Sequence, residues 1–325
     1  MHFHLQFPIP SFPQQLSYSD KLFFTGSCFA ENIGEKMKEE KLRVLINPHG
    51  VLYNPSAIEK AIRRYIGNES LKEDELFFAN ECWNSWEHHS RFSDPSKEAC
   101  LQQINTSVKS AHEQLRDAGW LFITFGSAFS YKHKGSGIPV GNCHKVPQKE
   151  FTKSLLSAEE VISAYTALFA ELKKLNPNLK IVLTVSPVRY VRDGVVENNL
   201  SKSILLQSVH RLVEMHEHVF YFPAYELVID DLRDYRFYKE DLVHPNEQAI
   251  DYVFGKLKEV LFDSSAKDLN KSIREILDAA KHRPFNENSE AHKKFKRTFE
   301  ERSLQLQKKY PFLDLGAGLD YLKSS

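Results

Sequence analysis

Residues 22–30 read Leu22-Phe23-Phe24-Thr25-Gly26-Ser27-Cys28-Phe29-Ala30, a short apolar run that ends in Gly-Ser. Apolar residues continue at helical spacing in Phe29, Ile33 and Met37, so the sequence predicts a buried strand followed at once by an amphipathic helix. A serine at this junction lies beside the helix N-terminus, where backbone N–H groups have no partner within the helix. Ser27 is therefore a candidate nucleophile, because such donors can stabilise an oxyanion. The simpler alternative is that its hydroxyl only caps the helix.

A second motif, Asp241-Leu242-Val243-His244, precedes Pro245 and another run of apolar residues at helical spacing. Proline suits the first turn of a helix, so the motif belongs to the loop before that helix. An Asp and a His three residues apart in a loop can both turn toward one serine. The His then acts as general base, and the carboxylate fixes its tautomer. We therefore predict a catalytic triad of Ser27, His244 and Asp241, with helix capping by the loop residues as the alternative.

The remaining apolar runs indicate strands that alternate with amphipathic helices. Such alternation predicts a three-layer, doubly wound α/β fold, with a parallel sheet of about five strands, helices on both faces and the functional crevice at the carboxyl ends of the strands. We expect this domain to span residues 1–261 and to be followed by a charged, helical extension over residues 262–325. The predicted strands are Leu22–Phe24, Arg43–Ile46, Leu121–Phe125, Ile181–Val185 and Val219–Phe222.

The overall composition favours a cytoplasmic enzyme that acts on a small molecule. The 325 residues include 43 basic and 43 acidic side chains, so no net field attracts nucleic acid or an anionic membrane. No run approaches the roughly 20 apolar residues that span a bilayer, and the first residues do not resemble a signal peptide.

The four cysteines lack C-x-x-C spacing, so we expect free thiols. Without a Walker loop, a G-x-G-x-x-G motif or a metal-ligand spacing, we expect no cofactor and no metal. The oligomeric state stays open.

Further blocks follow Gly26-Ser27-Cys28-Phe29-Ala30 along the chain up to about residue 260. They are Asn47-Pro48-His49-Gly50-Val51, Gly141-Asn142-Cys143-His144-Lys145, Ser186-Pro187-Val188-Arg189 and Tyr221-Phe222-Pro223-Ala224-Tyr225-Glu226. Together these blocks resemble the GSCFA family, which is placed among the SGNH/GDSL-like hydrolases. The resemblance implies a flavodoxin-like sheet of the SGNH-hydrolase type. It also implies an esterase or deacylase that passes an acyl group to Ser27 and then to water. Short acyl groups, such as acetyl on a carbohydrate-like molecule, are the substrates that the broad hydrolase group suggests.

The resemblance also suggests where an oxyanion hole would form. We expect donors from the Ser27 N–H and from the Gly50 N–H, since glycine lets the backbone approach the substrate closely. Related hydrolases add an asparagine side chain after the third strand, but residues 124–128 of this chain contain none. Asn142 is a candidate for the missing amide, or else a turn residue. Two alternatives stay open: an acyltransferase that uses the same triad, and a binding module whose triad is incomplete.

Other residues are candidates for contact with the substrate. An aromatic-rich insertion near residues 70–95, which includes Trp86 and His89, would form either a substrate wall or a small subdomain with its own core. His144, Lys145 and Arg189 would either bind the substrate or pack their own loops. We expect the Cys28 thiol to pack beneath the start of the helix rather than to act as the nucleophile.

Overall fold

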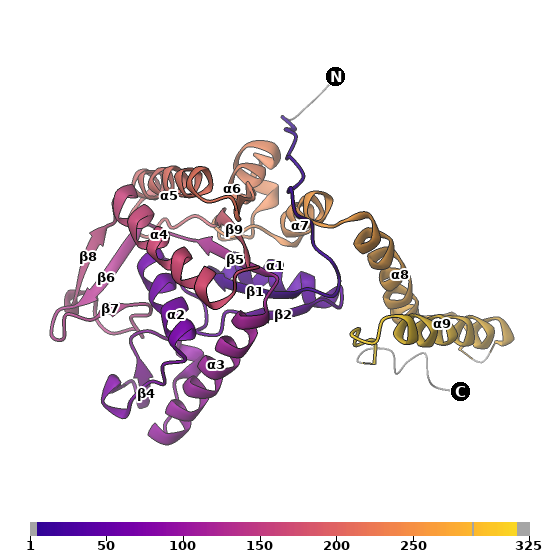
Figure 1. Cartoon of the computed structure of the whole chain (residues 1–325), viewed down its shortest axis with the longest axis horizontal. Coiled ribbons are helices and arrows are strands. Elements are labelled where there is room, and N and C mark those ends of the chain that lie inside the picture. Colours follow the sequence, from indigo (N-terminus) through magenta and orange to yellow (C-terminus); the bar gives the residue numbers. More distant parts are fainter. Residues whose placement is uncertain (1–4, 288, 317–325) are drawn as a thin grey trace.

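A computed structural model describes residues 5–287 and 289–316, and its centre is a five-stranded parallel sheet (Figure 1). The strand order is β10-β9-β5-β1-β2, which is the flavodoxin-like order 2-1-3-4-5 when the strands are numbered within this sheet. This arrangement confirms the predicted fold class, and each predicted strand end agrees to within two residues. The strands are β1 (Lys21–Gly26), β2 (Arg43–Ile46), β5 (Trp120–Phe125), β9 (Lys180–Val185) and β10 (Val219–Tyr221).

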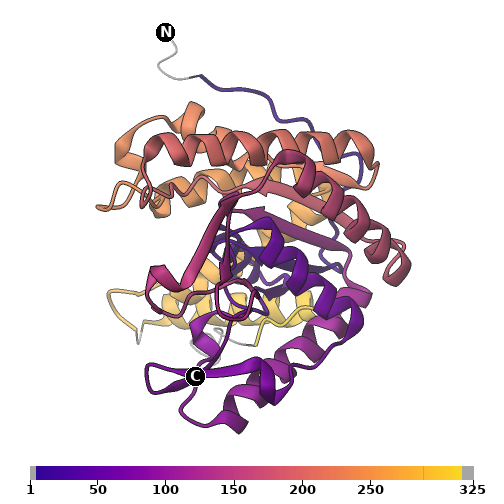
Figure 2. The ribbon, with the colours of Figure 1, turned by 90° about the vertical axis from the view of Figure 1, so that its left-hand side faces the viewer.

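Helices cover both faces of the sheet, as the view in Figure 2 shows. Successive side chains of a strand point to opposite faces, so Phe23 and Phe24 belong to two different cores. The Phe23 core packs against α2 (Pro55–Gly67), α3 (Lys97–Asp117), α4 (Ala158–Leu175) and α5 (Val195–Met215). The Phe24 core packs against α1 (Cys28–Glu39) and α7 (Glu247–Leu261).

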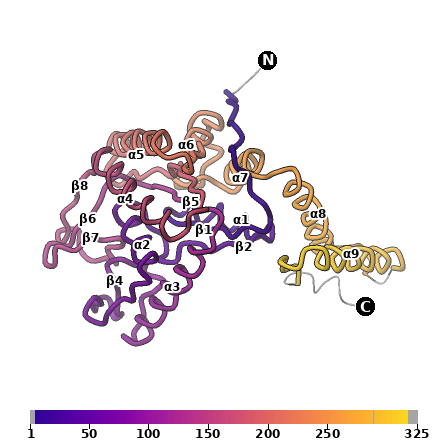
Figure 3. The backbone as a smooth tube through the Cα atoms, viewed as in Figure 1, coloured from indigo at the N-terminus to yellow at the C-terminus, as the bar shows by residue number. Residues whose placement is uncertain are grey.

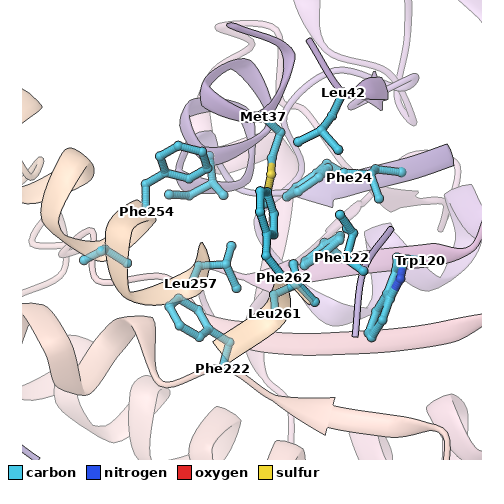
Figure 4. Packing of buried hydrophobic residues seen from close by; sticks show 14 of the residues in the cluster. Phe24, Met37, Leu42, Trp120, Phe122, Phe222, Phe254, Leu257, Leu261 and Phe262 are labelled. Atoms are coloured by element: carbon cyan, nitrogen blue, oxygen red, sulfur yellow. The ribbon is translucent and has the colours of Figure 1, made fainter. Parts of the chain in front are cut away.

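The Phe24 core is rich in aromatic side chains (Figure 4). Phe24 and Phe122 come from the neighbouring strands β1 and β5, and their rings stack with centroids 4.2 Å apart. Met37 of α1 and Leu257 of α7 close this layer. Because all of these side chains are buried, the core fixes the end of β1 against the start of α1.

The last two helices lead away from the sheet, as the tube in Figure 3 shows. Helix α8 (Ser264–Lys281) still contributes Leu269 and Ile273 to the Phe24 core, whereas α9 (Glu290–Lys309) packs on α8. The division at residue 261 into a domain and an extension stays a prediction, and residues 317–325 lie outside the described part. Among the described residues, no helix has both the length and the apolar character needed to cross a membrane.

Two small antiparallel sheets, which the sequence analysis did not predict, lie beside the main sheet. One pairs β3 (Leu76–Ala79) with β4 (Cys82–Ser85), and the other has the order β7-β6-β8. Strands β6 (Phe129–His133), β7 (Pro139–Val140) and β8 (Phe151–Leu155) follow the carboxyl end of β5. Short helical segments complete the chain: Glu73–Glu75, Ser90–Phe92, Gln148–Glu150, α6 (Ala224–Glu226), Leu227–Leu232 and Tyr235–Phe237.

Candidate active site

Ser27 lies where β1 meets α1, and the residue before it must be glycine. Gly26 has a φ of +130°, and a Cβ added there would lie 2.2 Å from the carbonyl oxygen of Thr124. Ser27 itself is extended and caps α1, because the Phe29 N–H donates to its Oγ at 3.3 Å. The capping alternative is therefore confirmed as a structural role. It does not exclude a chemical role, because Ser27 also lines a pocket.

This pocket has a volume of about 510 Å³ and lies at the carboxyl edge of the parallel sheet. Three of its lining residues directly follow strands: Ser27 after β1, Gly126 after β5 and Ser186 after β9. His244 also lines it, although this residue belongs to the loop before α7. The fold thus brings the two sequence motifs to one pocket.

Asp241 and His244 form a hydrogen-bonded pair. The Nδ1–H of His244 donates to Oδ2 of Asp241 at 2.7 Å, and the backbone N–H groups of Val243 and His244 donate to Oδ1 at 2.9 and 3.0 Å. These hydrogen bonds, led by the two backbone donors, lower the pKa of Asp241 to about 2. An ionised carboxylate at Nδ1 leaves Nε2 without its proton when the imidazole is neutral, which is the state that a general base requires.

The third member of the predicted triad is near this pair but is not bonded to it. Within residues 5–287 and 289–316, no hydrogen bond joins Ser27 Oγ to the His244 ring. The side chain of His244 is 45% exposed, so the ring has room to rotate or shift toward the serine. Catalytic hydrogen bonds are often long in unliganded enzymes and shorten only when substrate binds. The complete triad therefore stays a prediction.

Arg189 attaches the His244 loop to the loop that follows β9. Its backbone N–H donates to the carbonyl oxygen of Val243 and its Nη1 to that of Leu242, both at 3.2 Å. Its guanidinium also lies over the ring of Tyr238, with the two centres 4.3 Å apart. Arg189 was predicted as a substrate contact, and it does line the pocket. Its contacts show in addition that it supports the position of His244.

The two backbone groups predicted as oxyanion donors are engaged elsewhere in this conformation. The Ser27 N–H donates to the carbonyl oxygen of Thr124 at 3.1 Å, and the Gly50 N–H donates to that of Asn47 at 2.7 Å. Gly50 is not among the residues that line the pocket. A Cβ at position 50 would lie 2.1 Å from the Cβ of His89, so a close approach of two chain segments explains this glycine. Both groups would have to exchange these bonds before they could stabilise an oxyanion.

Asn142 and Ser127 are better placed to donate into the pocket, which both residues line. The Oδ1 of Asn142 accepts from the His144 N–H at 2.9 Å, and no partner for its Nδ2 exists among the described residues. The turn role and the donor role of Asn142 are therefore compatible. Ser127 belongs to the segment that lacks the expected asparagine, and its Oγ is 3.2 Å from the Oγ of Ser201.

Comparison with known protein families identifies the chain. The model of the GSCFA family matches residues 21–257. The chain belongs to the GSCFA family. A second model, described as the C-terminal domain of GSCFA domain proteins, matches residues 273–325.

Comparisons with individual proteins add little to the family assignment. No curated protein matches this GSCFA chain. A solved structure of an acetyl xylan esterase from the rumen bacterium Butyrivibrio proteoclasticus is similar over 81% of this chain, with 12% identity and a TM-score of 0.37. The match spans 66% of that esterase, which is less than two thirds of its length.

Three of the other predicted substrate contacts in this GSCFA protein do not line the pocket. His144 is buried, and its Nε2–H donates to the carbonyl oxygen of Ser85 at 2.8 Å. Trp86 stacks on Phe77 with ring centroids 3.6 Å apart, and Lys145 is exposed on its loop. The structure therefore assigns packing roles to His144 and Trp86, because their side chains point into a small core rather than into the pocket.

The insertion near residues 70–95 forms a small core of its own, which is one of the two roles that the sequence left open, and the substrate-wall role stays a prediction. Leu71, Leu76 and Phe92 form a small core with residues of α3, so most of the insertion is a subdomain. His89 is the one residue of this described range that lines the pocket. The aromatic side chains of the insertion therefore mainly pack against other side chains of the protein.

Lys202 is the most unusual residue near the site of this GSCFA protein, and it was not among the predicted site residues. It is 2% exposed, and its Nζ donates to the carbonyl oxygens of Gly126 and Ser186 at 2.7 and 2.6 Å. Burial lowers the pKa of this lysine to about 7. A sequence signal existed: Lys202 precedes Leu205 and Val209 on the buried face of α5, where a charged residue needs an explanation.

Cys28 differs from its prediction. The thiol is half-buried and lines the pocket instead of packing beneath the helix. Burial raises the pKa of the thiol, which keeps it protonated and makes it a poor nucleophile. Ser27 therefore remains the candidate nucleophile.

Proposed function

We propose that this protein is a serine-dependent ester hydrolase. The observation that carries the proposal is the His244–Asp241 hydrogen bond, which orients a ring that lines the same pocket as Ser27. A serine at a helix N-terminus and a histidine oriented by a carboxylate are the parts that acyl transfer to serine needs.

The reaction would proceed in two halves. Ser27 Oγ attacks the acyl carbon of the ester while its proton passes to Nε2 of His244. The tetrahedral intermediate then breaks its bond to the alcohol, which leaves with the proton from His244. In the second half, water gives a proton to the same nitrogen and attacks the acyl carbon. The bond to Ser27 breaks as Nε2 of His244 returns this proton to Ser27 Oγ, so the carboxylic acid is released and both the serine and the imidazole are regenerated.

Stabilisation of the oxyanion would come from three sources in this pocket. Ser27 is at the N-terminus of α1, where the helix dipole favours negative charge. The Nδ2 of Asn142 and the hydroxyl of Ser127 are side-chain donors in the same lining. Loss of a single donor of this kind typically lowers kcat by about 100- to 1,000-fold.

The test compares hydrolysis of p-nitrophenyl acetate and butyrate by the wild type and by Ser27→Ala. We expect Ser27→Ala to lose at least about 1,000-fold in kcat/KM, while Ser203→Ala, an exposed serine on α5, keeps wild-type activity. A fluorophosphonate probe should label the wild type at Ser27, as read by peptide mass spectrometry. Equal turnover by the wild type and Ser27→Ala would exclude the serine mechanism.

A further inference from the structure

We infer that the acyl group of the natural ester is apolar and larger than acetyl, and that it binds against the small β7-β6-β8 sheet. This inference rests on the proposed hydrolase function. It goes beyond that function because it assigns a substrate class to the pocket.

Many of the side chains that line the pocket are apolar or aromatic. The small sheet contributes Phe129, Tyr131, Val140 and Phe151 to the lining. The loops around it add Tyr53, Cys143, Val146, Val188, Tyr190 and Val191. An acyl chain or an aromatic ring would exchange water for these surfaces, which is the main source of apolar binding energy.

Several polar groups in the same lining are paired within the protein. The hydroxyls of Tyr131 and Tyr190 are 3.2 Å apart and share a hydrogen bond. The Oγ of Ser186 accepts from the Val188 N–H at 3.2 Å, and Oδ1 of Asn54 caps α2 at 2.8 Å. A sugar ring placed against these paired groups would lose hydrogen bonds to water without gaining new ones from them.

The charges near the pocket agree with this assignment. Among the residues that the structure describes, no aspartate or glutamate lines it, whereas Arg189 and Arg192 do. The ammonium of Lys153 lies 3.8 Å from the centre of the Phe129 ring and is paired with Asp193, so this part of the wall is held in place. An acyl group that carried a positive charge would find no carboxylate partner in the lining.

The size of the pocket exceeds what acetyl requires. Pockets that enclose drug-sized ligands measure roughly 300–1,000 Å³, and the 510 Å³ found here falls in that range. Acetyl would touch a small part of the apolar wall. Each further buried methylene can strengthen binding by up to about fourfold, so a longer chain gains affinity that acetyl cannot reach.

The experiment measures kcat/KM for p-nitrophenyl acetate, butyrate and octanoate below the micelle concentration of the longest ester. We expect octanoate to exceed acetate by at least about 30-fold in the wild type, with all activity dependent on Ser27. Val146→Trp should fill the pocket and lower the ratio of octanoate to acetate turnover at least about tenfold. Leu304→Trp, on the exposed face of α9, is the matched control for an added indole.

The outcomes separate this inference from the proposed function. Activity that depends on Ser27 but favours acetate would overturn the inference and leave the hydrolase intact. A preference for octanoate that Val146→Trp does not reduce would show that the acyl group binds elsewhere, which also overturns it. Activity that survives Ser27→Ala would remove the proposed function itself. If Val146→Trp lowers the melting temperature by more than about 5 °C, Val188→Trp on another part of the lining repeats the test.

Discussion

Ser27 and His244 line one pocket, yet Ser27 is 1% exposed at the end of a buried strand, whereas 45% of the His244 side chain is exposed on a loop. Ser27 is fixed by the sheet, because Gly26 permits a close contact with Thr124 and the Ser27 N–H is bonded to the same residue. His244 is fixed by Asp241 within its own loop and by Arg189 from outside it. The contrast indicates a rigid nucleophile and a base whose position depends on a few polar contacts.

The largest expected effect comes from removing the base. His244→Gln should lower kcat/KM for a p-nitrophenyl ester by about 1,000- to 10,000-fold, because the imidazole that takes the serine proton is removed. The melting temperature should stay within about 2 °C of the wild type, since the ring is partly exposed. Steady-state kinetics and a thermal melt measure both quantities. Activity within tenfold of the wild type would show that His244 is not the base.

Lys202→Met tests the rigid side of the comparison, which is the set of strand ends around Ser27. The variant leaves the carbonyl oxygens of Gly126 and Ser186 without their shared donor, so we expect a loss of about 1–3 kcal/mol in unfolding free energy at pH 7. The pKa of Lys202 is lower in the folded state, at about 7, than in the unfolded state. The unfolded chain therefore binds an extra proton between pH 7 and about 10, and the wild type gains stability with rising pH relative to the variant.

Urea unfolding of both proteins at pH 7 and pH 9 measures this difference. Lys256→Met, a lysine on the outer side of α7, is the control for loss of a lysine. A stability difference that does not change with pH would show that Lys202 stays charged in the folded protein across this range.

Arg189→Ala tests the other side of the comparison, the position of His244. Without the guanidinium, residue 189 keeps only its backbone bond to Val243, so His244 should occupy its working position less often. We expect kcat to fall about 10- to 50-fold with a change of less than about 1 kcal/mol in stability. The wild-type KM for an uncharged ester should be retained, which distinguishes a positioning role from a substrate contact. A rise in KM alone would assign Arg189 to substrate binding.

The smallest expected effect concerns the unfolding free energy at acidic pH, which depends on two buried histidines outside the Ser27 site. His49 and His88 are buried with their rings stacked 3.9 Å apart, and burial lowers both pKa values, that of His88 to about 3. They stay neutral in the folded protein while the unfolded chain protonates them below about pH 6.5, so stability falls as the pH drops from that value. Each histidine should cost about 1.4 kcal/mol between pH 7.5 and 5.5.

Unfolding free energies of the wild type and His88→Gln at these two pH values check this expectation. The variant is less stable throughout but should lose about half as much on acidification. The exposed His210→Gln should keep the wild-type slope. An unchanged slope in His88→Gln would mean that the buried pair does not govern acid stability.

The main sheet and the positions of the two motifs could be predicted because each depends on a short, continuous stretch of sequence. Strands such as β5 and β9 are continuous apolar runs, and the positions of Ser27 and His244 follow from the ends of such elements. Strand β8 was missed because its burial alternates, which leaves no apolar run to detect. The pocket wall that β8 helps to build was missed with it.

Side-chain direction was the part that the sequence could not supply. His144 and Trp86 come from segments near the site, yet their rings pack in the small core that includes Val140 and Phe151 and do not line the pocket themselves. Lys202 was not selected as a site residue, although it takes the place of an apolar side chain on the buried face of α5. The direction of each of these side chains depends on tertiary packing, which cannot be deduced from residue spacing.

The alternation of Phe23 and Phe24 between two cores has a consequence for the nucleophile. Insertion of one residue within β1 would exchange the faces of the strand and place each ring in the wrong core. It would also advance Ser27 by roughly 3.3 Å along the strand axis, past its partner on β5. The number of residues in β1 therefore determines where the Ser27 hydroxyl lies relative to the hydrophobic core. We expect β1 to tolerate substitutions far better than insertions or deletions.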